Sequence, residues 1–464
     1  MRLSRFQFLA ASSAAFLAVT AQAATRPRYG GTLRVELQAQ VSSLDPAAWP
    51  EDAASTRALA KLSDLVYDRL VRFDAQGKFQ PALAIRWEHD AQSATWRFYL
   101  RPGVKWHDGS PLIAADVLPA LENAVPGHPF RPAGDALEID TGDPQLDLLL
   151  TLATSPQAII RHGRSGAGGG PPVGTGPFRV ADWQPGRRLV LTANDDCWAG
   201  RPYLDAIEIS LGRASRDQLI DLELDKTAVV TLDPAEARRA QQEGRRVWTS
   251  APVELVCLWS AEVEDPRLRE AVARSIDRSA IQKVLVQNFG EVAAGILPAW
   301  LSGYALLFST EPNLDRARQL RAEIGLPAAL KLGYDANDPL ARQVADRIAV
   351  NARDAGITLQ PIPLPGGRVG SAGAELFIRS FRIDGPVFAA ATREAIRRGL
   401  LRSGTRDTPE DVYAAERESI DNFTVVPLVD VPEIVGLGAR VENWIAPPWG
   451  AWRLDEIWLE AAKP

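Results

Sequence analysis

Residues 329–364 constrain the fold of this chain more than any other segment. A short apolar run from Leu330 to Tyr334 and a second from Ile357 to Ile362 are each typical of a buried strand. Between them, Asp338 and Pro339 supply a helix N-cap and a first helical position. The apolar residues that follow are spaced by four: Leu340, Val344, Ile348 and Ala352. Strand, helix and strand in this order predict a right-handed βαβ unit with parallel strands, which is typical of an α/β lobe.

Two further helices are predicted upstream of this unit. Asp265 begins the first, and Ser279 begins a continuation of it, while Asn313 caps the second. The first half of the chain differs in its predicted secondary structure. Short alternating segments bounded by Gly, Pro and Asp predict mixed or antiparallel sheet over residues 31–101 and 174–211.

Length and charge narrow the class of protein. A chain of 464 residues exceeds what one hydrophobic core usually organises, so two or three domains are expected. The first 23 residues combine two charges, an apolar stretch and a small-residue end, which is typical of a cleaved secretory signal peptide. Removal of Arg2 and Arg5 takes the formal net charge from −6 to −8. Such an acidic exported protein is a poor candidate for binding nucleic acid or an anionic membrane.

The run from Thr95 to Asp116, TWRFYLRPGVKWHDGSPLIAAD, has the pattern of a strand, tight turns and a helix start. It resembles the signature region of the family 5 extracellular solute-binding proteins, periplasmic receptors for peptides, nickel and some sugars that feed ABC importers. Further segments resemble the same family in the same order along the chain: YGGTLR from Tyr29, LVYDRLVRFD from Leu65, GTGPFRVADW from Gly174 and DPRLREAVARSIDRSAI from Asp265. Together these segments cover most of the chain.

The resemblance implies an α/β fold with two lobes, like a class II periplasmic binding protein, joined by hinge segments and carrying an inserted small domain. The implied division of the chain is as follows: signal peptide 1–23; first lobe 24–61, 173–259 and 430–464; inserted small domain 62–172; second lobe 260–429. Because neither Cys197 nor Cys257 lies at the end of the signal peptide, no lipid-attachment cysteine is expected, and the protein should diffuse freely in the periplasm. A disulfide between the two is one alternative in that oxidising space. The resemblance favours unpaired thiols, since members often carry an aromatic residue in place of Cys197.

Catalytic and metal motifs are not found. The sequence has no HExxH helix, no P-loop and no serine elbow at a strand-to-helix turn, and no two of its four histidines are four residues apart. His107 and Asp108 offer a metal or proton site, but turn chemistry explains the pair better. No cofactor and no bound metal are therefore expected. A secreted hydrolase that uses clustered carboxylates such as Asp195 and Asp196 stays open as an alternative.

Five residues are candidates for ligand contact. In the run FIRSFRIDGP, Asp384 matches the aspartate with which peptide-binding members hold the peptide ammonium, although the tryptophan and second aspartate of their motif are missing. Arg382, two residues earlier on the same strand face, would complement an anionic ligand or neutralise Asp384. A surface ion pair is the alternative for both. The resemblance suggests that Trp259, Trp300 and Ser43 face the cleft, with core packing or a plain turn as alternatives.

The resulting expectation is a periplasmic substrate-binding protein of an ABC importer. It would bind a peptide or another small organic solute by lobe closure and present the closed surface to an ABC permease in the inner membrane. It is expected to be a monomer without a nucleic-acid partner and without enzymatic activity. Two alternatives remain: a sensory or scaffold binding protein without transport, and the carboxylate-dependent hydrolase.

Overall fold

The protein is described from a computed structural model. The described residues are 26–45, 53–74, 76–90, 92, 94–142, 147–154, 159, 172–260, 262–303, 308–325, 329–364, 373–383, 385–447, 449 and 452–461. The predicted signal peptide and Asp384 lie outside these residues. None of the helices within the described ranges is long and apolar enough to cross a membrane.

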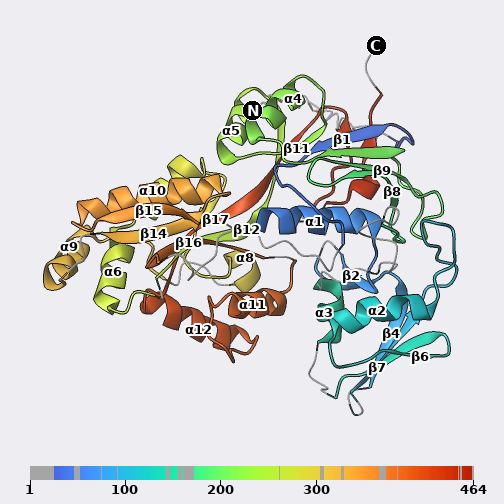
Figure 1. The fold of residues 1–464 in the computed structure, drawn as a ribbon, viewed down its shortest axis with the longest axis horizontal. Coiled ribbons are helices and arrows are strands. Elements are labelled where there is room, and N and C mark those ends of the chain that lie inside the picture. The colour runs from blue at the N-terminus through green and yellow to red at the C-terminus, as the bar shows by residue number, and fades with distance from the viewer. Residues whose placement is uncertain are drawn as a thin grey trace, which may run out of the picture.

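Within the described residues, a mixed sheet of 11 strands has the order β15-β14-β16-β12-β17-β11-β1-β10-β9-β8, with β13 paired to β17 (Figure 1). The strand bounds are β1 Thr32–Glu36, β8 Phe178–Gln184, β9 Arg188–Ala193, β10 Ala206–Ser210, β11 Val229–Thr231, β12 Arg246–Trp259, β13 Glu291–Val292, β14 Leu330–Asp335, β15 Leu359–Leu364, β16 Leu376–Arg382 and β17 Val425–Leu437. The two long strands β12 and β17 pair antiparallel from one half of the molecule into the other. They are therefore the crossing segments between two halves: one half holds β1 and β8 to β11, and the other holds β14 to β16.

The predicted βαβ unit is confirmed. Strands β14 and β15 pair in parallel, and α10 (Pro339–Asp354) connects them. The carboxylate of Asp338 accepts hydrogen bonds from the backbone N–H groups of Leu340 and Ala341 at 2.9 and 3.0 Å, which is the N-cap that the sequence predicts. Four-residue spacing then buries one face of α10 against the sheet.

The upstream helices begin where the sequence places them, with one correction. Asp265 caps α6 (Pro266–Ser275) and Asn313 caps α9 (Leu314–Glu323), each through a side-chain oxygen that accepts a backbone N–H. The expected start at Ser279 is wrong, because Asp277 caps the next helix, α7 (Arg278–Ala280), by accepting from the N–H of Ala280 at 2.9 Å. A π-helical turn, Ile281–Leu285, follows α7 directly.

The first half of the chain has the mixed pairing expected of it. Strand β1 pairs in parallel with β10 and β11, whereas β10, β9 and β8 pair antiparallel. A separate antiparallel sheet has the order β4-β5-β7-β6, and β2 and β3 form a hairpin. Two helices, α2 (Ala114–Ala124) and α3 (Leu148–Thr154), pack with them. The bounds of these strands are β2 Val71–Phe73, β3 Phe79–Pro81, β4 Ala84–Asp90, β5 Thr95–Leu100, β6 Arg131–Ala133 and β7 Ala136–Asp140.

The signature run forms β5, two turns and the start of α2, as the sequence indicates. The carboxylate of Asp108 accepts from the backbone N–H of Ser110 at 3.0 Å, which confirms the turn interpretation. The ring of His107 is buried: Nε2 donates to the carbonyl of Gly176 at 3.0 Å, and Nδ1 accepts from the N–H of Gly174 at 3.3 Å. Burial lowers the pKa of His107 to about 4. The block therefore ties the inserted sheet to the segment that begins β8.

Helices cover both faces of the long sheet (Figure 1). Over β14, β16 and β12, one face carries α6, α9 and α10, and the other carries α8 (Ala299–Ser302), α11 (Phe388–Arg397) and α12 (Pro409–Asp421). Over β1 and β11, α1 (Ala53–Val66) covers one face, while α4 (Ser215–Glu223) and α5 (Pro234–Gln242) cover the other. The lobe boundaries given by the sequence stay a prediction.

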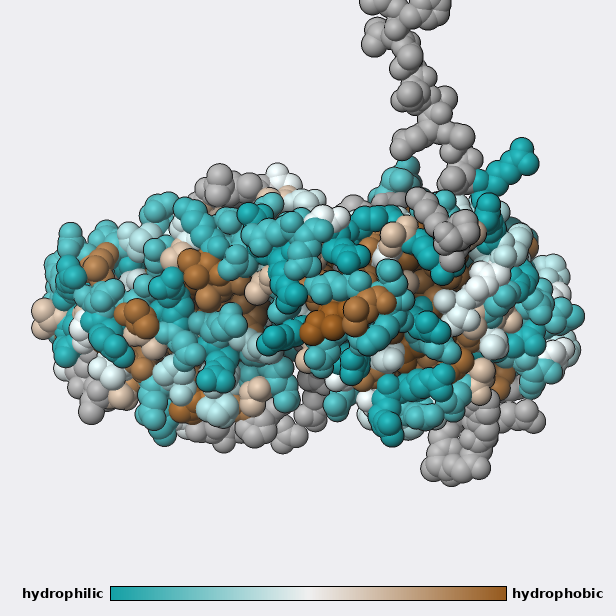
Figure 2. Space-filling view, turned by 90° about the horizontal axis from the view of Figure 1, so that it is seen from above, coloured by the Kyte–Doolittle hydropathy of each residue, from teal (hydrophilic) through white to brown (hydrophobic). Residues whose placement is uncertain are grey.

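The surface of the described residues is mostly hydrophilic. Figure 2, which looks down on the top of Figure 1, shows apolar residues in separate patches over both halves. Exposed large apolar side chains include Leu224, just after α4, and Val350 on α10. Cys197 and Cys257 are both free, and burial raises the pKa of the Cys257 thiol to about 12.

Candidate functional site

Charged side chains from both halves of the molecule meet where β12 and β17 cross between them. Arg57 and Lys61 are four residues apart, so both lie on one face of α1. Lys61 forms an ion pair with Glu433 of β17, and Arg382 at the end of β16 lies 3.6 Å from the other Glu433 oxygen. Arg57 donates to Glu254 of β12 at 2.8 Å. These five residues, Arg57, Lys61, Glu254, Arg382 and Glu433, are the junction cluster.

The strand register explains why these residues converge. Glu254 on β12 lies directly opposite Arg382 on β16, and β17 runs along the other edge of β12. The backbone N–H of Glu433 donates to the hydroxyl of Ser250 at 2.8 Å, which fixes this part of β17 against β12. The cluster therefore depends on three strands that are far apart in the sequence.

The junction cluster is desolvated and has more cations than carboxylates. The side chains of Lys61, Glu433 and Arg382 are 10, 10 and 11% exposed. Burial lowers the pKa of Lys61 to about 8, although Glu433 partly offsets this effect. For Glu433, burial alone would raise the pKa, but Lys61 and Arg382 lower it more, so the carboxylate stays ionised. The ammonium of Lys61 also lies 4.1 Å from the ring centroid of Trp452.

Trp300 is held beside the same junction. Its indole N–H donates to the carbonyl of Pro252, two residues before Glu254, at 2.6 Å. The segment that leads to Trp300 is anchored by buried Glu416 on α12, whose carboxylate accepts from the N–H groups of Ile296 and Leu297 at 2.7 and 2.8 Å. Trp300 packs on the core that includes Phe381 and Ile383, which flank Arg382 on β16 and point to the opposite face of that strand. Contact of Arg382 and Trp300 with a ligand stays a prediction.

The chain just after Arg382 touches the hairpin of β2 and β3. A methyl group on Gly77, at the tip of this hairpin, would lie 2.8 Å from Cγ of Pro386, and one on Gly385 would lie 3.9 Å from the ring of Phe73. The hairpin packs on the core of the sheet β4 to β7, so the inserted part that carries this sheet contacts the half that carries β16. Asp384 lies outside the described residues, and its contact with a ligand stays a prediction.

Ser43 forms a local turn, which is the simpler of its two interpretations. Its hydroxyl oxygen accepts from the backbone N–H of Asp45 at 3.1 Å. This hydrogen bond explains the residue type without a ligand. A direct role for Ser43 in binding stays a prediction.

Trp259 lies apart from Arg382 along the sheet, although it packs on the same cluster as Trp300. Its contact with a ligand stays a prediction. Trp259 is at the far end of β12, opposite Phe377 and Val425 and five residues from Glu254. Five residues of strand span about 16 Å. The sequence could not show this separation because it gives no distance from the junction.

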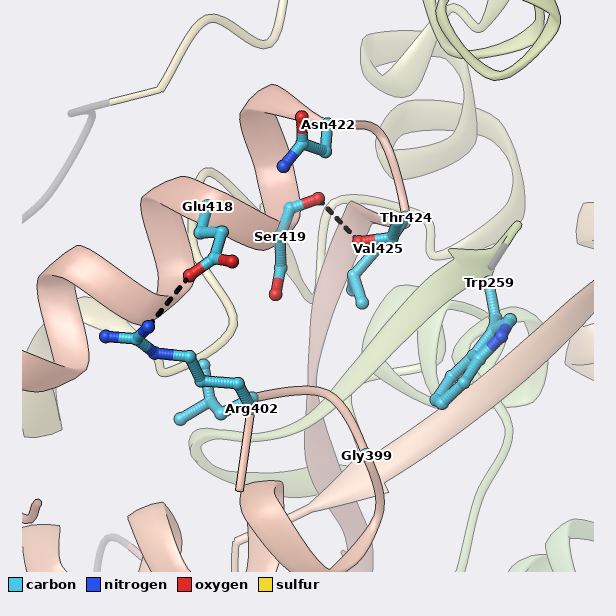
Figure 3. Close-up of a pocket in the computed structure, with 9 residues that line it drawn as sticks. Trp259, Gly399, Arg402, Glu418, Ser419, Asn422, Thr424 and Val425 are labelled. Carbon is cyan, nitrogen blue, oxygen red and sulfur yellow. Dashed lines mark hydrogen bonds and ion pairs between the residues drawn. The ribbon is translucent and has the colours of Figure 1, made fainter. Parts of the chain in front are cut away.

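Trp259 instead forms one wall of a small cavity between β12, α12 and the loop after α11 (Figure 3). The cavity has a volume of about 260 Å³, and an ion pair between Arg402 and Glu418, with atoms 3.5 Å apart, lies on its opposite side. Gly399 is required here, because a methyl group at this position would lie 2.8 Å from Cη2 of Trp259. The volume is below that of most ligand pockets.

Sequence reasoning missed four of the five residues in the junction cluster. One signal was available: Glu433 stands in the long apolar run VVPLVDVPEIVGL, where a glutamate needs a buried partner. Arg57, Lys61 and Glu254 carry no such signal. Within the described ranges, no group of three or more His, Cys, Asp or Glu side chains could hold a metal ion.

Comparison with known proteins gives both a matching family and a matching fold. Residues 78–375 match the family model described as bacterial extracellular solute-binding proteins, family 5 Middle. The chain is 24% identical over 312 residues to the nickel-binding protein NikA of Staphylococcus aureus, covering 63% of each protein. It is 24% identical over 348 residues to the dipeptide-binding protein of Escherichia coli, covering 63% of this chain and 65% of that protein. Both alignments span slightly less than two thirds of the relative's length.

Solved structures confirm the predicted α/β fold of a two-lobed periplasmic binding protein. NikA from Staphylococcus aureus in complex with Ni(L-His)2 superposes with a TM-score of 0.76 at 19% identity, covering 92% of this chain and 100% of that one. DppA from Helicobacter pylori in complex with the peptide STSA superposes with a TM-score of 0.78 at 19% identity, covering 94% and 99%.

Proposed function

Since this chain belongs to the bacterial extracellular solute-binding proteins of family 5, we propose that it binds a peptide or another small organic solute by lobe closure and delivers it to an ABC permease. The junction cluster carries the proposal. Its buried ion pairs join α1 to β16, β17 and β12, so a change in lobe angle must break or form them. Two crossing strands supply the hinge for such a change.

Peptides lead among the ligand classes. One relative is named as a dipeptide-binding protein, from Escherichia coli, and one similar structure, DppA from Helicobacter pylori, contains a bound peptide. Arg382 supplies a guanidinium, and Asp384 follows two residues later in the sequence, so a ligand with both an ammonium and a carboxylate has a partner for each charge. Trp300 adds an indole beside the neighbouring strand β12.

The test is to identify the ligand directly. The protein is purified gently after export, and the co-purifying small molecules are analysed by mass spectrometry, with thermal-shift screens against dipeptides, tripeptides, sugars and Ni(L-His)2. We expect a set of short peptides and a rise in Tm with peptides. Arg382→Gln and Asp384→Asn should reduce that rise, whereas Arg417→Gln, at an exposed ion pair on α12, should leave it unchanged. Absence of any co-purifying solute and of any stabilisation would overturn the proposal.

The proposed location and assembly have their own tests. We propose cleavage of the signal peptide after Ala23 or Ala24, a periplasmic location and a monomeric state. N-terminal sequencing of the exported protein and light scattering after size-exclusion chromatography check these points. Incubation of peptide ligands with the protein should give no product, since a receptor releases its solute unchanged. A hydrolase would instead cleave the peptide.

A further inference from the structure

We propose that Phe289 is a positioning residue for lobe closure: its ring forms an apolar contact between the halves beside the crossing strand β17 and thereby sets the angle between the lobes. The proposal rests on the proposed function, because closure is the event that Phe289 would adjust. Its test below needs no ligand.

Phe289 packs against two hydrophobic clusters that belong to different halves of the molecule. One is the core beneath α6, α9 and α10, which includes Val286 and Val429. The other is the cluster beneath α4 and α5, which includes Leu222, Ala240 and Ile434. The ring of Phe289 is partly buried against both. It therefore joins the halves without belonging to the core of either one.

The alternation of side chains along β17 shows that the two clusters contacted by Phe289 lie on different faces of this strand. Successive residues of a strand point to opposite faces of the sheet. Glu433 points to the face covered by α1, where it meets Lys61. Ile434 points to the other face, into the cluster of α4 and α5 that Phe289 contacts. Val429, in the other cluster, has the same parity as Glu433, so Phe289 contacts clusters on both faces of β17.

The backbone holds Phe289 in place. The residues before it, Gln287 and Asn288, have φ values of 52 and 63°, a left-handed conformation that non-glycine residues rarely adopt. Hydrogen bonds fix this turn: the N–H of Asn288 donates to the carbonyl of Gln282 at 3.1 Å, and the Gln282 side chain donates to the carbonyl of Gly290 at 3.0 Å. A π-helical turn precedes them, and such turns are frequent at functional sites.

Gly290 allows this segment to pack closely on the crossing strand β17. A methyl group on Gly290 would lie 2.4 Å from the backbone carbonyl oxygen of Asp430 on β17, so only glycine allows the approach. Strand β13 then continues along β17 from Asp430 to Val429. The ring of Phe289 is thus fixed relative to the crossing strand. Its contact with the cluster of α4 and α5 therefore depends on the angle between the two halves.

In the present arrangement the ring of Phe289 contributes apolar contact to both halves. A wider angle between the halves breaks this contact. Removing the ring should therefore favour the open form. Phe289→Ala should lower the closed population about tenfold, with an equal loss of apparent affinity for any ligand that binds the closed form.

Distances between two spin labels test this expectation without a ligand. The labels are placed at Ile113, at the start of α2, and at Glu410 on α12, after Cys197→Ser; Cys257 is fully buried. Pulsed electron paramagnetic resonance should give a longer and broader distance distribution for Phe289→Ala. Leu314→Ala is the matched control, because Leu314 packs on the core of α6, α9 and α10 and is not part of the α4–α5 cluster. Its distribution should equal that of the parent.

The outcomes separate this proposal from the proposed function. A folded Phe289→Ala variant with the parent's distance distribution would overturn the role of Phe289, whatever ligand is found. If that variant does not fold, Phe289→Leu and Phe289→Val carry the test: a graded lengthening supports the proposal, and identical distributions reject it. Failure to find a ligand would count against the receptor function and would leave the measured distances valid.

Discussion

Glu433 is the residue on which the junction cluster depends, because it is the carboxylate that meets cations from two different elements. Lys61 comes from α1 and Arg382 from β16, and all three side chains are nearly inaccessible to water. A buried ion pair stabilises little by itself, but removing one partner leaves an uncompensated charge. The cluster therefore contributes to specifying the lobe arrangement more than to net stability.

Replacement of Glu433 by glutamine should be strongly destabilising. Lys61 and Arg382 would lose their shared carboxylate in a desolvated site, so we expect the free energy of unfolding to fall by about 3 kcal/mol. Urea unfolding at pH 7 measures the change. Adding Lys61→Met to this variant should restore at least half of the loss, because it removes one of the unpaired charges.

The control is an exposed pair of the same chemistry. Arg417 and Asp421 on α12 lie 3.2 Å apart with side chains that are 63 and 60% exposed. Asp421→Asn should cost less than about 0.5 kcal/mol. Equal losses for Glu433→Gln and Asp421→Asn would show that the junction cluster is solvated and would remove its proposed role.

His107 gives the protein a pH dependence in the acidic range. Its pKa is about 4 in the folded protein because the ring is buried, against 6.5 for an ordinary histidine. Between these pH values the unfolded chain binds a proton that the folded protein does not bind, so stability falls as the pH is lowered. We expect a loss of about 3 kcal/mol from pH 6.5 to pH 4, at 1.36 kcal/mol per pH unit. Urea unfolding across this range measures it.

His107→Gln isolates this contribution. The amide of glutamine can still donate to the carbonyl of Gly176 but does not titrate. The difference in stability between parent and variant should narrow as the pH falls from 6.5 to 4. His128→Gln replaces a histidine outside this contact and serves as the control. A constant difference between parent and His107→Gln over the range would contradict the assignment.

At the scale of elements, the hairpin of β2 and β3 is a rigid contact between the inserted part and the half that carries β16. The carboxylate of Asp74 accepts from the N–H groups of Gln76 and Lys78, both at 2.9 Å, and so closes the loop that carries Gly77. Gly77 has a φ of 78° and faces Pro386. Both the backbone conformation and the close approach require glycine.

Gly77→Ala should cost more than its backbone conformation explains. Gly103 has nearly the same φ, 75°, but nothing lies within 4 Å of the position of a methyl group there. Gly103→Ala therefore measures the conformational cost alone, about 1 kcal/mol. Gly77→Ala should cost at least about 1 kcal/mol more, because the new methyl group collides with Pro386. Urea unfolding of both variants gives the comparison.

A double variant tests the collision itself. Pro386→Gly removes both side-chain atoms that the methyl group would meet, Cγ at 2.8 Å and Cβ at 2.9 Å, so it should relieve the extra cost of Gly77→Ala. Additive effects of the two substitutions would show that the hairpin does not press on this segment in solution.

Local signals in the sequence predicted individual elements well. The caps at Asp338, Asp265 and Asn313 are correct because a capping carboxylate or amide acts within three residues of itself. The start at Ser279 is wrong because Asp277, two residues earlier, is the capping residue and its carboxylate takes the N–H of Ala280. The π-helical turn carries no sequence signal of this kind.

Arrangements that need several distant segments were beyond the sequence. The βαβ unit could be predicted because its parts are adjacent in the chain, whereas the pairing of β12 with β17 joins residues about 180 positions apart. The junction cluster depends on that pairing and on α1. Trp259 and Trp300 looked equivalent in the sequence, yet the register of β12 separates them by much of a strand.

At the scale of the whole molecule, the two halves share one sheet while the inserted part has its own. Strands β12 and β17 cross from half to half with their hydrogen bonds in place, so unfolding one half disrupts the sheet of the other. The antiparallel sheet of β4 to β7 has a separate core that includes Phe98, Trp106 and Leu137. Units with separate cores can unfold separately.

Calorimetry should therefore show two transitions, one for the inserted part and one for the two halves together. Phe98 is fully buried in the first core, and Phe98→Ala should cost about 3–5 kcal/mol there. For a unit of about 100 residues this loss lowers Tm by about 10 °C or more. Leu428→Ala, at a fully buried position of β17, should lower the other Tm and leave the first unchanged. A single transition that both variants shift alike would mean that the inserted part and the halves unfold as one unit. In that case the contact of Gly77 with Pro386 and the hydrogen bond of His107 to Gly176 couple the cores too strongly for either core to unfold by itself.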